Sequence, residues 1–225
     1  MKQTPMSFEV NQELLDILPS SIQSVVEVGC GSGALGDAFK KRSNHCIWKG
    51  LDIDRNCVEN ASRVLDSVAE VDLDLVPEGF FQQFRQIECW VFGDSLEHLK
   101  DPWGVLRNVV EVLPAQGYVA ICVPNSQHWS VWLQMALGDF KYMDSGLLDR
   151  THLRWFSRAT IITLLEEAGL HVLKGVKREY SEKNRELVIA AFLRFCQSIG
   201  IKELQQLEQD LKPQQYVFLA QKAGG

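Results

Sequence analysis

The hydrophobic pattern of this chain alternates between short apolar runs and stretches in which apolar residues recur every three or four positions. Short runs of this kind predict buried strands, and the longer period predicts amphipathic helices. Helical stretches separate most of the strands, so the pattern indicates βαβ units and an α/β protein whose largely parallel sheet is covered on both faces. The predicted strands are 22–28, 47–53, 68–71, 89–92, 118–123, 170–177 and 215–221.

Residues with helix-capping chemistry predict where three of the helices begin. Ser7 is the expected N-cap of an opening helix over 7–18. Asp101 followed by Pro102 is a second such start, because proline suits the first helical position. Ser157 is the third, and its helix is expected to end at Gly169.

Two segments are too long to be plain connections between neighbouring elements. Residues 125–157 separate the fifth predicted strand from its helix, and residues 181–213 separate the last two strands. The second segment has two amphipathic patterns, one of them with Leu187, Ala191 and Phe195 on a single face. Neither segment has a linker-like border, so we expect one domain over 1–225, with a substrate-side insertion at 125–157 and a helical insertion at 181–213.

Composition excludes several classes of protein. Apolar residues make up 46% of the chain and charged residues 23%, which is ordinary globular usage and argues against disorder or coiled coil. The net charge of −6 disfavours binding to a nucleic-acid backbone. No apolar run reaches the ~18 residues of a membrane span, and the first residues do not resemble a signal peptide. With six cysteines in mostly apolar surroundings, we expect reduced thiols and a cytoplasmic location. The sequence leaves the oligomeric state open.

A glycine-rich turn follows the first predicted strand. The segment Glu27–Gly33 leaves a strand and opens a helix, so it brings bare N–H groups and a helix N-terminus to one point that suits a polar or anionic small molecule. Asp52 ends the second strand about 20 residues further on, where a carboxylate is placed to accept both ribose hydroxyls. Both features also fit a dinucleotide, and each is also compatible with a purely structural turn.

Two further strand ends carry polar residues. Asp72 follows the third strand and is a candidate acceptor for an adenine amino group, with an exposed turn residue as the alternative. The segment 93–102, Gly-Asp-Ser-Leu-Glu-His-Leu-Lys-Asp-Pro, follows the fourth strand and places several polar groups where apolar ones would be expected. Ligands of parallel sheets bind beyond the carboxyl ends of the strands, so these groups are predicted to share one site.

Taken together, these motifs resemble the class I S-adenosylmethionine-dependent methyltransferases, in particular the branch that acts on small molecules in quinone, glycan and secondary-metabolite biosynthesis. The resemblance covers about residues 20–178 and the last strand. It is carried by E-V-G-C-G-S-G (27–33), L-D-I-D (51–54), D-S-L-E-H-L-K-D-P (94–102), V-P-N (123–125) and T-H-L-R-W-F-S (151–157). It implies a Rossmann-like, doubly wound sheet of seven strands, parallel except for the last.

The resemblance also implies which residues contact the cofactor. The glycines would wrap its methionine part, Glu27 would hold the loop or the amino group, and Asp52 would take the ribose hydroxyls. Asp72 with Leu73 would contact the adenine, and Asp94 with Ser95 would border the methionine end. The full expected set is Glu27, Gly29, Cys30, Gly31, Gly33, Asp52, Ile53, Asp72, Leu73, Asp94 and Ser95.

Methyl transfer to a small-molecule hydroxyl is the expected reaction, and it needs a base. His98 and His152 are the candidate catalytic residues, since histidine accepts protons near neutral pH. An alternative use of the same region is a divalent cation held by Asp94, Glu97, His98 and the remote His152, which we consider less favoured than hydrogen-bonding roles. An NAD(P)-dependent oxidoreductase and a non-catalytic S-adenosylmethionine-binding module are the alternative functions.

Overall fold

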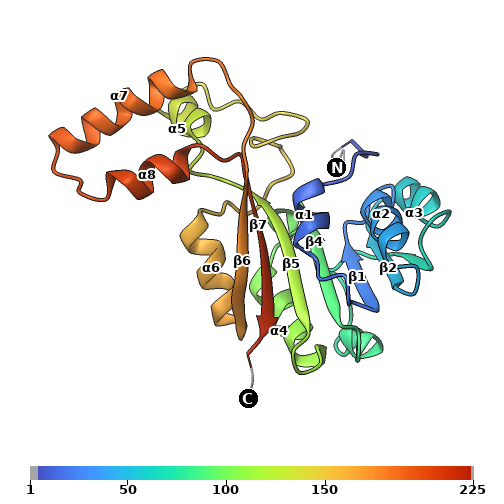
Figure 1. Ribbon diagram of the computed structural model, residues 1–225. Coiled ribbons are helices and arrows are strands. Elements are labelled where there is room, and N and C mark those ends of the chain that lie inside the picture. Colours follow the sequence, from blue (N-terminus) through green and yellow to red (C-terminus); the bar gives the residue numbers. More distant parts are fainter. Residues whose placement is uncertain (1–4, 224–225) are drawn as a thin grey trace.

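A seven-stranded sheet forms the centre of the molecule in the computed structural model, which describes residues 5–223 (Figure 1). The strand order is β3-β2-β1-β4-β5-β7-β6. The strands are β1 (Ser24–Val28), β2 (Ile47–Asp52), β3 (Ser67–Glu70), β4 (Cys89–Gly93), β5 (Tyr118–Pro124), β6 (Leu170–Arg178) and β7 (Gln215–Lys222).

The strand directions confirm the predicted sheet. β1 pairs in parallel with β2 and β4, and the outward neighbours β3 and β5 continue in the same direction. β7 runs antiparallel to both β5 and β6. The order reverses between β1 and β4, so the loops that follow these two strands separate and leave room for a ligand.

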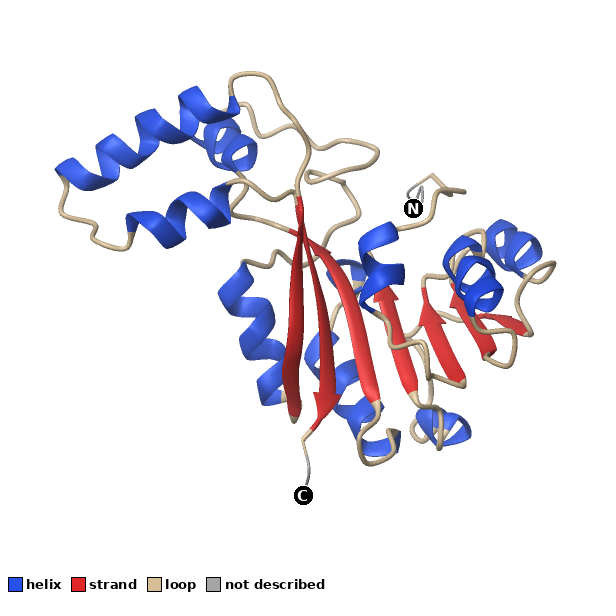
Figure 2. Cartoon of the chain, viewed as in Figure 1, coloured by secondary structure: helices blue, strands red, loops and turns tan. Residues whose placement is uncertain are grey.

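Helices cover both faces of this sheet (Figure 2). One buried cluster packs the sheet against α4, α6 and the short η1, and the other packs it against α1 and α2. The helices are α1 (Gln12–Ile17), α2 (Ala34–Arg42), α3 (Arg55–Ala61), η1 (Phe80–Phe84), η2 (Leu96–His98), α4 (Pro102–Val112), α5 (Trp129–Ala136), α6 (Arg158–Glu167), α7 (Arg185–Ser198) and α8 (Leu204–Leu211).

Two of the three predicted helix starts are confirmed and one is wrong. The Asp101 side chain accepts from the backbone N–H of Gly104 at the start of α4. Ser157 forms a capping box at the start of α6. The opening helix, however, begins four residues later than predicted, because the side chain of Asn11, and not that of Ser7, accepts from the N–H of Leu14.

The two predicted insertions lie side by side beyond the ends of β5, β6 and β7 (Figure 1). The first contains α5, and the second contains α7 and α8. They pack together through the rings of Trp132 and Phe192, whose centroids are 4.0 Å apart. The predicted apolar face of α7 is exposed at Leu187 and Phe195, while Ile189 is buried. Together with Trp132 and Leu133 of α5, this face lines a shallow apolar groove.

The base of the helical insertion is held to the sheet by buried polar contacts. Asn125, fully buried at the end of β5, donates through its side-chain amide to the backbone carbonyls of Asp210 and Pro213. The Asp210 carboxylate in turn accepts from Arg158 and from the Tyr216 hydroxyl. A buried amide and carboxylate are stable only when they are hydrogen-bonded, so these contacts fix where the insertion leaves the sheet.

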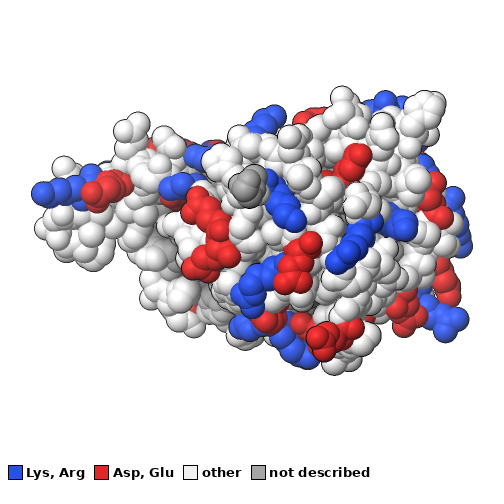
Figure 3. All heavy atoms as spheres, turned by 90° about the horizontal axis from the view of Figure 1, so that it is seen from below, with Lys and Arg blue, Asp and Glu red and all other residues white. Residues whose placement is uncertain are grey.

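The described helices are all too short or too polar to cross a lipid bilayer. Over the face at which the parallel strands begin, Lys and Arg alternate with Asp and Glu (Figure 3). That face therefore presents no continuous basic surface to a polyanion such as nucleic acid.

A substitution at Gly36 tests how closely α2 packs on β2. A Cβ at Gly36 would lie 2.5 Å from Leu65 Cδ2 and 2.7 Å from the ring of the buried Trp48. We expect Gly36→Ala to lower the free energy of unfolding by about 1–3 kcal/mol, because overpacking outweighs the gain in helix propensity. Urea denaturation measures the change. Lys41→Ala on the exposed face of the same helix is the control, and a stability of Gly36→Ala equal to or above that of the control would contradict the packing argument.

Candidate active site

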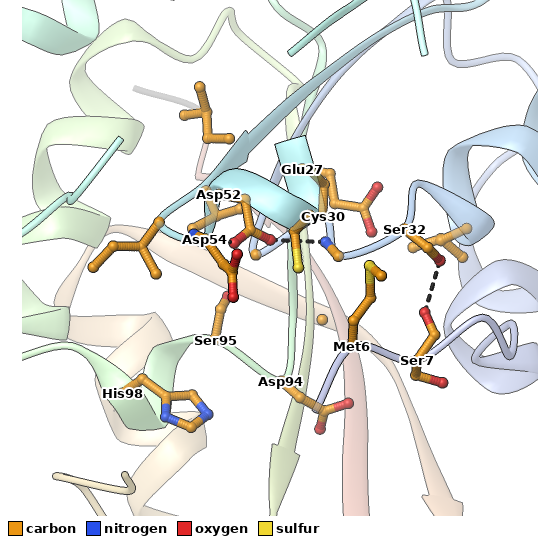
Figure 4. A pocket seen from close by; sticks show the side chains of 18 of the residues that line it. Met6, Ser7, Glu27, Cys30, Ser32, Asp52, Asp54, Asp94, Ser95 and His98 are labelled. Carbon is orange, nitrogen blue, oxygen red and sulfur yellow. Dashed lines mark hydrogen bonds between the residues drawn. The ribbon is translucent and has the colours of Figure 1, made fainter. Parts of the chain in front are cut away.

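A cavity of about 580 Å³ opens at the carboxyl ends of β1, β2 and β4 (Figure 4). The loops after these strands line it, together with residues 5–11 and the end of β6. With the exception of Gly33, the cofactor residues expected from the sequence all line this cavity. The strand-end rule therefore gathers residues that are distant in sequence into one site.

The glycine loop takes backbone conformations that other residues rarely adopt. Gly29 has φ of +70° and Gly31 has φ of +53°, and a Cβ at Gly31 would point into space free of described atoms. The loop thus presents bare backbone to the cavity. Gly33 differs from expectation, because it caps α2 and a Cβ there would meet Val64 at 2.8 Å. Its glycine is required by packing against α3 and not by cavity lining.

Asp52 is held in place by backbone amides on both carboxylate oxygens. The N–H of Gly31 donates to Oδ2 at 2.8 Å, and the N–H of Asp54 donates to Oδ1 at 2.9 Å. Each oxygen keeps a further lone pair that can accept from a ligand hydroxyl. Burial raises the pKa of Asp52 against these hydrogen bonds. The position and orientation fit the ribose-binding role.

Glu27 is the most buried carboxyl group of the cavity wall. Its Oε2 accepts from the indole N–H of Trp48 at 2.7 Å. Burial raises its pKa to about 8, although the hydrogen bond from Trp48 acts in the opposite direction. Without a ligand, Glu27 is therefore largely protonated at neutral pH.

The residues expected to contact the adenine are both apolar and polar, and all of them line the cavity. Leu73 is buried against the cavity, while Ile53 is half exposed at its rim. Asp72 lies in a turn, where its Oδ1 accepts from the backbone N–H of Asp74, and it also lines the cavity, so its expected contact with adenine stays a prediction. Cys30 lies at the same wall, and burial raises its pKa so that it remains a thiol.

Ser95 and Asp94, which follow β4, also line the cavity (Figure 4). The Ser95 hydroxyl is buried and has no hydrogen-bond partner among the described residues. An unpartnered hydroxyl facing a cavity is a position where a ligand can complete the hydrogen bonding. Asp94 has φ of +60°, an uncommon conformation for a residue with a side chain, which the N–H contact with the carbonyl of Cys122 helps to hold.

The two candidate histidines lie together but only one faces the cavity. His98 lines the cavity, and His152 lies behind it with the ring centroids 4.9 Å apart. Burial lowers the pKa of both rings, that of His152 to about 4, so both are neutral at pH 7. The structure also brings Glu97 to this pair, with its Oε1 3.9 Å from His152 Nε2.

The four candidate metal ligands do not all meet. Possible ligand atoms of Glu97, His98 and His152 lie within 4.8 Å of one another, and Asp94 is not part of this group. The reason is local, since η2 is a short 3-10 turn and not the α-helix on which the predicted spacing was based. Burial, with the nearby charges of Asp94 and Asp149, raises the pKa of Glu97 well above its usual range.

Several cavity residues were missed by the sequence analysis. Thr151 and Arg178 line the cavity, as does a strap formed by residues 5–11, tied down where the Ser32 hydroxyl donates to the carbonyl of Ser7 at 2.7 Å. Arg178 ends β6, so the strand-end argument applied to that strand would have identified it. No sequence pattern predicts the strap, because its contacts with the cavity come from a loop and not from the end of a strand.

Negative charge dominates the cavity wall. Arg178 is the one lysine or arginine among the described lining residues. Seven residues with carboxyl side chains also line the cavity: Glu9, Glu27, Asp52, Asp54, Asp72, Asp74 and Asp94. Such a field attracts cations and repels anions. A sulfonium cofactor fits this wall, whereas the pyrophosphate of a dinucleotide would meet repulsion from most of it.

The match to known families identifies the chain. A family model described as "Methyltransferase domain" matches residues 6–174. The chain belongs to this methyltransferase family. No curated protein matches the sequence. The match covers all four strand-end motifs around the cavity, and it does not favour the oxidoreductase alternative.

Solved structures show the same fold for this methyltransferase. A SAM-dependent methyltransferase from Archaeoglobus fulgidus is 18% identical with a TM-score of 0.62, covering 90% of this chain and 87% of that one. The plantazolicin methyltransferase BpumL in complex with SAH is 14% identical with a TM-score of 0.57, covering 90% and 77%. The [4+2]-cyclase SpnF, 15% identical with a TM-score of 0.59 and covering 95% and 80%, shows that the fold also carries other chemistry. The fold is that of class I S-adenosylmethionine-dependent enzymes.

Glu27 gives the methyltransferase a measurable proton linkage. A cationic cofactor favours the ionised carboxylate, so binding should release up to about one proton near pH 7 and should strengthen as pH rises from 6 towards 8.5. Calorimetry in buffers of different ionisation enthalpy measures the release. Glu27→Gln should abolish the proton release. If the heat of cofactor binding to the wild-type protein does not depend on the buffer, the protonated state of Glu27 in the free protein is contradicted.

Proposed function

We propose that this protein transfers the methyl group of S-adenosylmethionine to a hydroxyl oxygen of a small, uncharged acceptor. The observation that carries the proposal is an anionic cavity at the carboxyl ends of the strands with His98 at its edge. An acceptor that carries phosphate or carboxylate near the reacting atom would be repelled by the same wall.

The cavity residues fit the expected cofactor. Asp52 would hold the ribose, Asp72 and Leu73 the adenine, and Gly29, Gly31 and Ser95 the methionine part. When bound, the cofactor supplies an electrophilic methyl group on a positively charged sulfur. The residues of the chain contribute by fixing the acceptor in line with that methyl, since alignment alone accounts for much of the acceleration in such displacements.

His98 is the proposed base. Its Nδ1 lies 3.2 Å from the carbonyl oxygen of Thr151 and 3.0 Å from the hydroxyl oxygen. A carbonyl only accepts, so Nδ1 carries the hydrogen and Nε2 is free to take a proton from the acceptor. The Thr151 hydroxyl donates to buried Asp149 at 2.7 Å, and the negative charge of Asp149 favours the imidazolium that forms.

We propose a positioning role for His152, since it packs edge-on against His98 and does not line the cavity. A divalent cation is the second candidate for this cluster, favoured by one observation: Glu97 Oε2 is buried without a hydrogen-bond partner among the described residues. A cation there would orient the acceptor and lower the pKa of its hydroxyl. Loss of activity on chelation, restored by magnesium or manganese, would favour this second candidate.

An assay of S-adenosylhomocysteine formation tests the proposed function. Purified protein is incubated with S-adenosylmethionine and a panel of hydroxylated acceptors, each paired with its phosphorylated or carboxylated form. We expect product with an uncharged member and little with its anionic pair. In parallel, S-adenosylmethionine should raise the melting temperature and NADH should not. Stabilisation by NADH alone would favour the oxidoreductase. Cofactor binding without turnover across the panel would favour the non-catalytic module.

Substitution of His98 tests the proposed base. We expect His98→Gln to lower kcat about 10²–10⁴-fold while leaving the affinity for S-adenosylhomocysteine within about threefold. The pKa of His98 is lowered by burial, so wild-type kcat should rise with pH through a midpoint below 6.5, and the variant should lack this rise. His171→Gln, on the exposed part of β6, is the matched control. An unchanged pH profile in His98→Gln would assign the base elsewhere.

A further inference from the structure

A chain of side-chain contacts runs from the cavity to the base of the helical insertion. Gln215, the first residue of β7, donates through its side-chain N–H to Asp94 Oδ1. Arg178, the last residue of β6, donates to the side-chain oxygen of the same glutamine. Arg178 also donates to Glu13 of α1 at 2.9 Å. Four elements that are distant in sequence therefore meet at one edge of the cavity.

The direction of these hydrogen bonds is fixed by chemistry. A guanidinium only donates and an ionised carboxylate only accepts, so the Gln215 amide has one orientation that satisfies both partners. Asp94 accepts from Gln215 at Oδ1, its carboxylate also has a side-chain hydrogen bond with Cys122, and the residue lines the cavity. The uncommon backbone conformation of Asp94, with φ of +60°, is consistent with a side chain held for function.

Both partners of Asp94 lie where the helical insertion meets the sheet. Arg178 comes just before the insertion and Gln215 just after it, and they are paired residues of β6 and β7. The backbone N–H of Gln214 donates to the carbonyl of Arg178 at 2.9 Å, and the Gln214 side chain donates to Glu182 at 2.9 Å. The base of the insertion is thus rigidly closed by contacts that also orient the residues facing Asp94.

We propose that Gln215 and Arg178 are positioning residues that hold the Asp94 carboxylate toward the ammonium group of the cofactor's methionine tail. The proposal rests on the proposed function for the identity of the cofactor. A cation is the expected partner, because a carboxylate of the ligand would be repelled by Asp94. It also gives the helical insertion a role, since closing its base places both residues.

Two ligands separate positioning from a general structural effect. S-adenosylhomocysteine has the amino-acid tail, and 5′-methylthioadenosine has the same adenosine and sulfur without it. We expect Gln215→Leu to weaken S-adenosylhomocysteine about tenfold, as for loss of a charge-assisted hydrogen bond, and to leave 5′-methylthioadenosine within about twofold. Calorimetry measures both dissociation constants. Gln221→Leu, at the other end of β7 with a bond to the carbonyl of Gln116, is the matched control and should change neither.

A double-mutant cycle tests whether Gln215 acts through Asp94. Asp94→Asn should weaken S-adenosylhomocysteine at least as much as Gln215→Leu does, and the double variant should be no weaker than Asp94→Asn alone, because coupled residues are not additive. Arg178→Met should behave as Gln215→Leu does. Glu13→Gln removes the ion-pair partner of Arg178 on α1 and should have an effect below about threefold, because the Arg178–Gln215 contact remains.

Each outcome decides for or against the proposal. Equal weakening of both ligands by Gln215→Leu, or additive effects in the cycle, would overturn the positioning role while leaving the proposed function intact. If Arg178→Met does not fold, the Gln215 and Asp94 variants decide the matter. A wild-type protein that binds neither S-adenosylhomocysteine nor S-adenosylmethionine would overturn the proposed function and this proposal with it.

Discussion

The hydrogen bond from the Gly31 amide to Asp52 is the contact on which the site depends. It joins the loop after β1 to the end of β2, and thereby fixes the distance between the loop proposed to hold the methionine part and the carboxylate proposed to hold the ribose. The bond requires the loop to turn back on itself, which glycine allows through its positive φ. Gly31 also lines the cavity and presents no side chain to it, so one backbone position serves both the geometry of the turn and the space for a ligand.

The rest of the cavity follows from the topology of the sheet. Parallel strands end at one edge, and each strand end there carries polar groups that cannot be buried in the sheet itself. The cost of assembling so many carboxyl groups is reduced by amide donors at Asp52 and by an indole donor at Glu27. The two insertions add contacts near the end of β6, which also borders the cavity. Trp129 donates to Glu182, as does Gln214, so contacts between the two insertions also stabilise the end of β6.

The sequence pattern predicts the strands well because buried parallel strands are short, apolar and bounded by turn residues. Most of the residues that line the cavity could be predicted because they lie at, or just after, the carboxyl end of a strand. The contact of Gln215 with Asp94 could not be predicted, because the two residues lie 121 positions apart and Gln215 begins a strand, where the strand-end rule does not apply. The exposure of the apolar face of α7 could not be predicted either, since periodicity shows that a helix has an apolar face and not what that face contacts. The N-cap at Asn11 was missed because serine and asparagine are both good caps, and tertiary contacts of Ser7 decide between them.

Burial has opposite effects on the acids and the bases of this site, and the two effects serve the same reaction. It raises the pKa of Glu27 and lowers that of His98, so the ligand-free site carries less charge than its composition implies. A bound cation reverses the first effect, because it stabilises the ionised carboxylate beside it. In the proposed reaction, transfer of the methyl group removes the positive charge on sulfur, and His98, the proposed base, gains a proton from the acceptor. The product would thus lose part of the attraction that held the substrate, in a cavity that had become more positive on its acceptor side. On this proposal, release of the product is favoured by the same charges that select the cofactor.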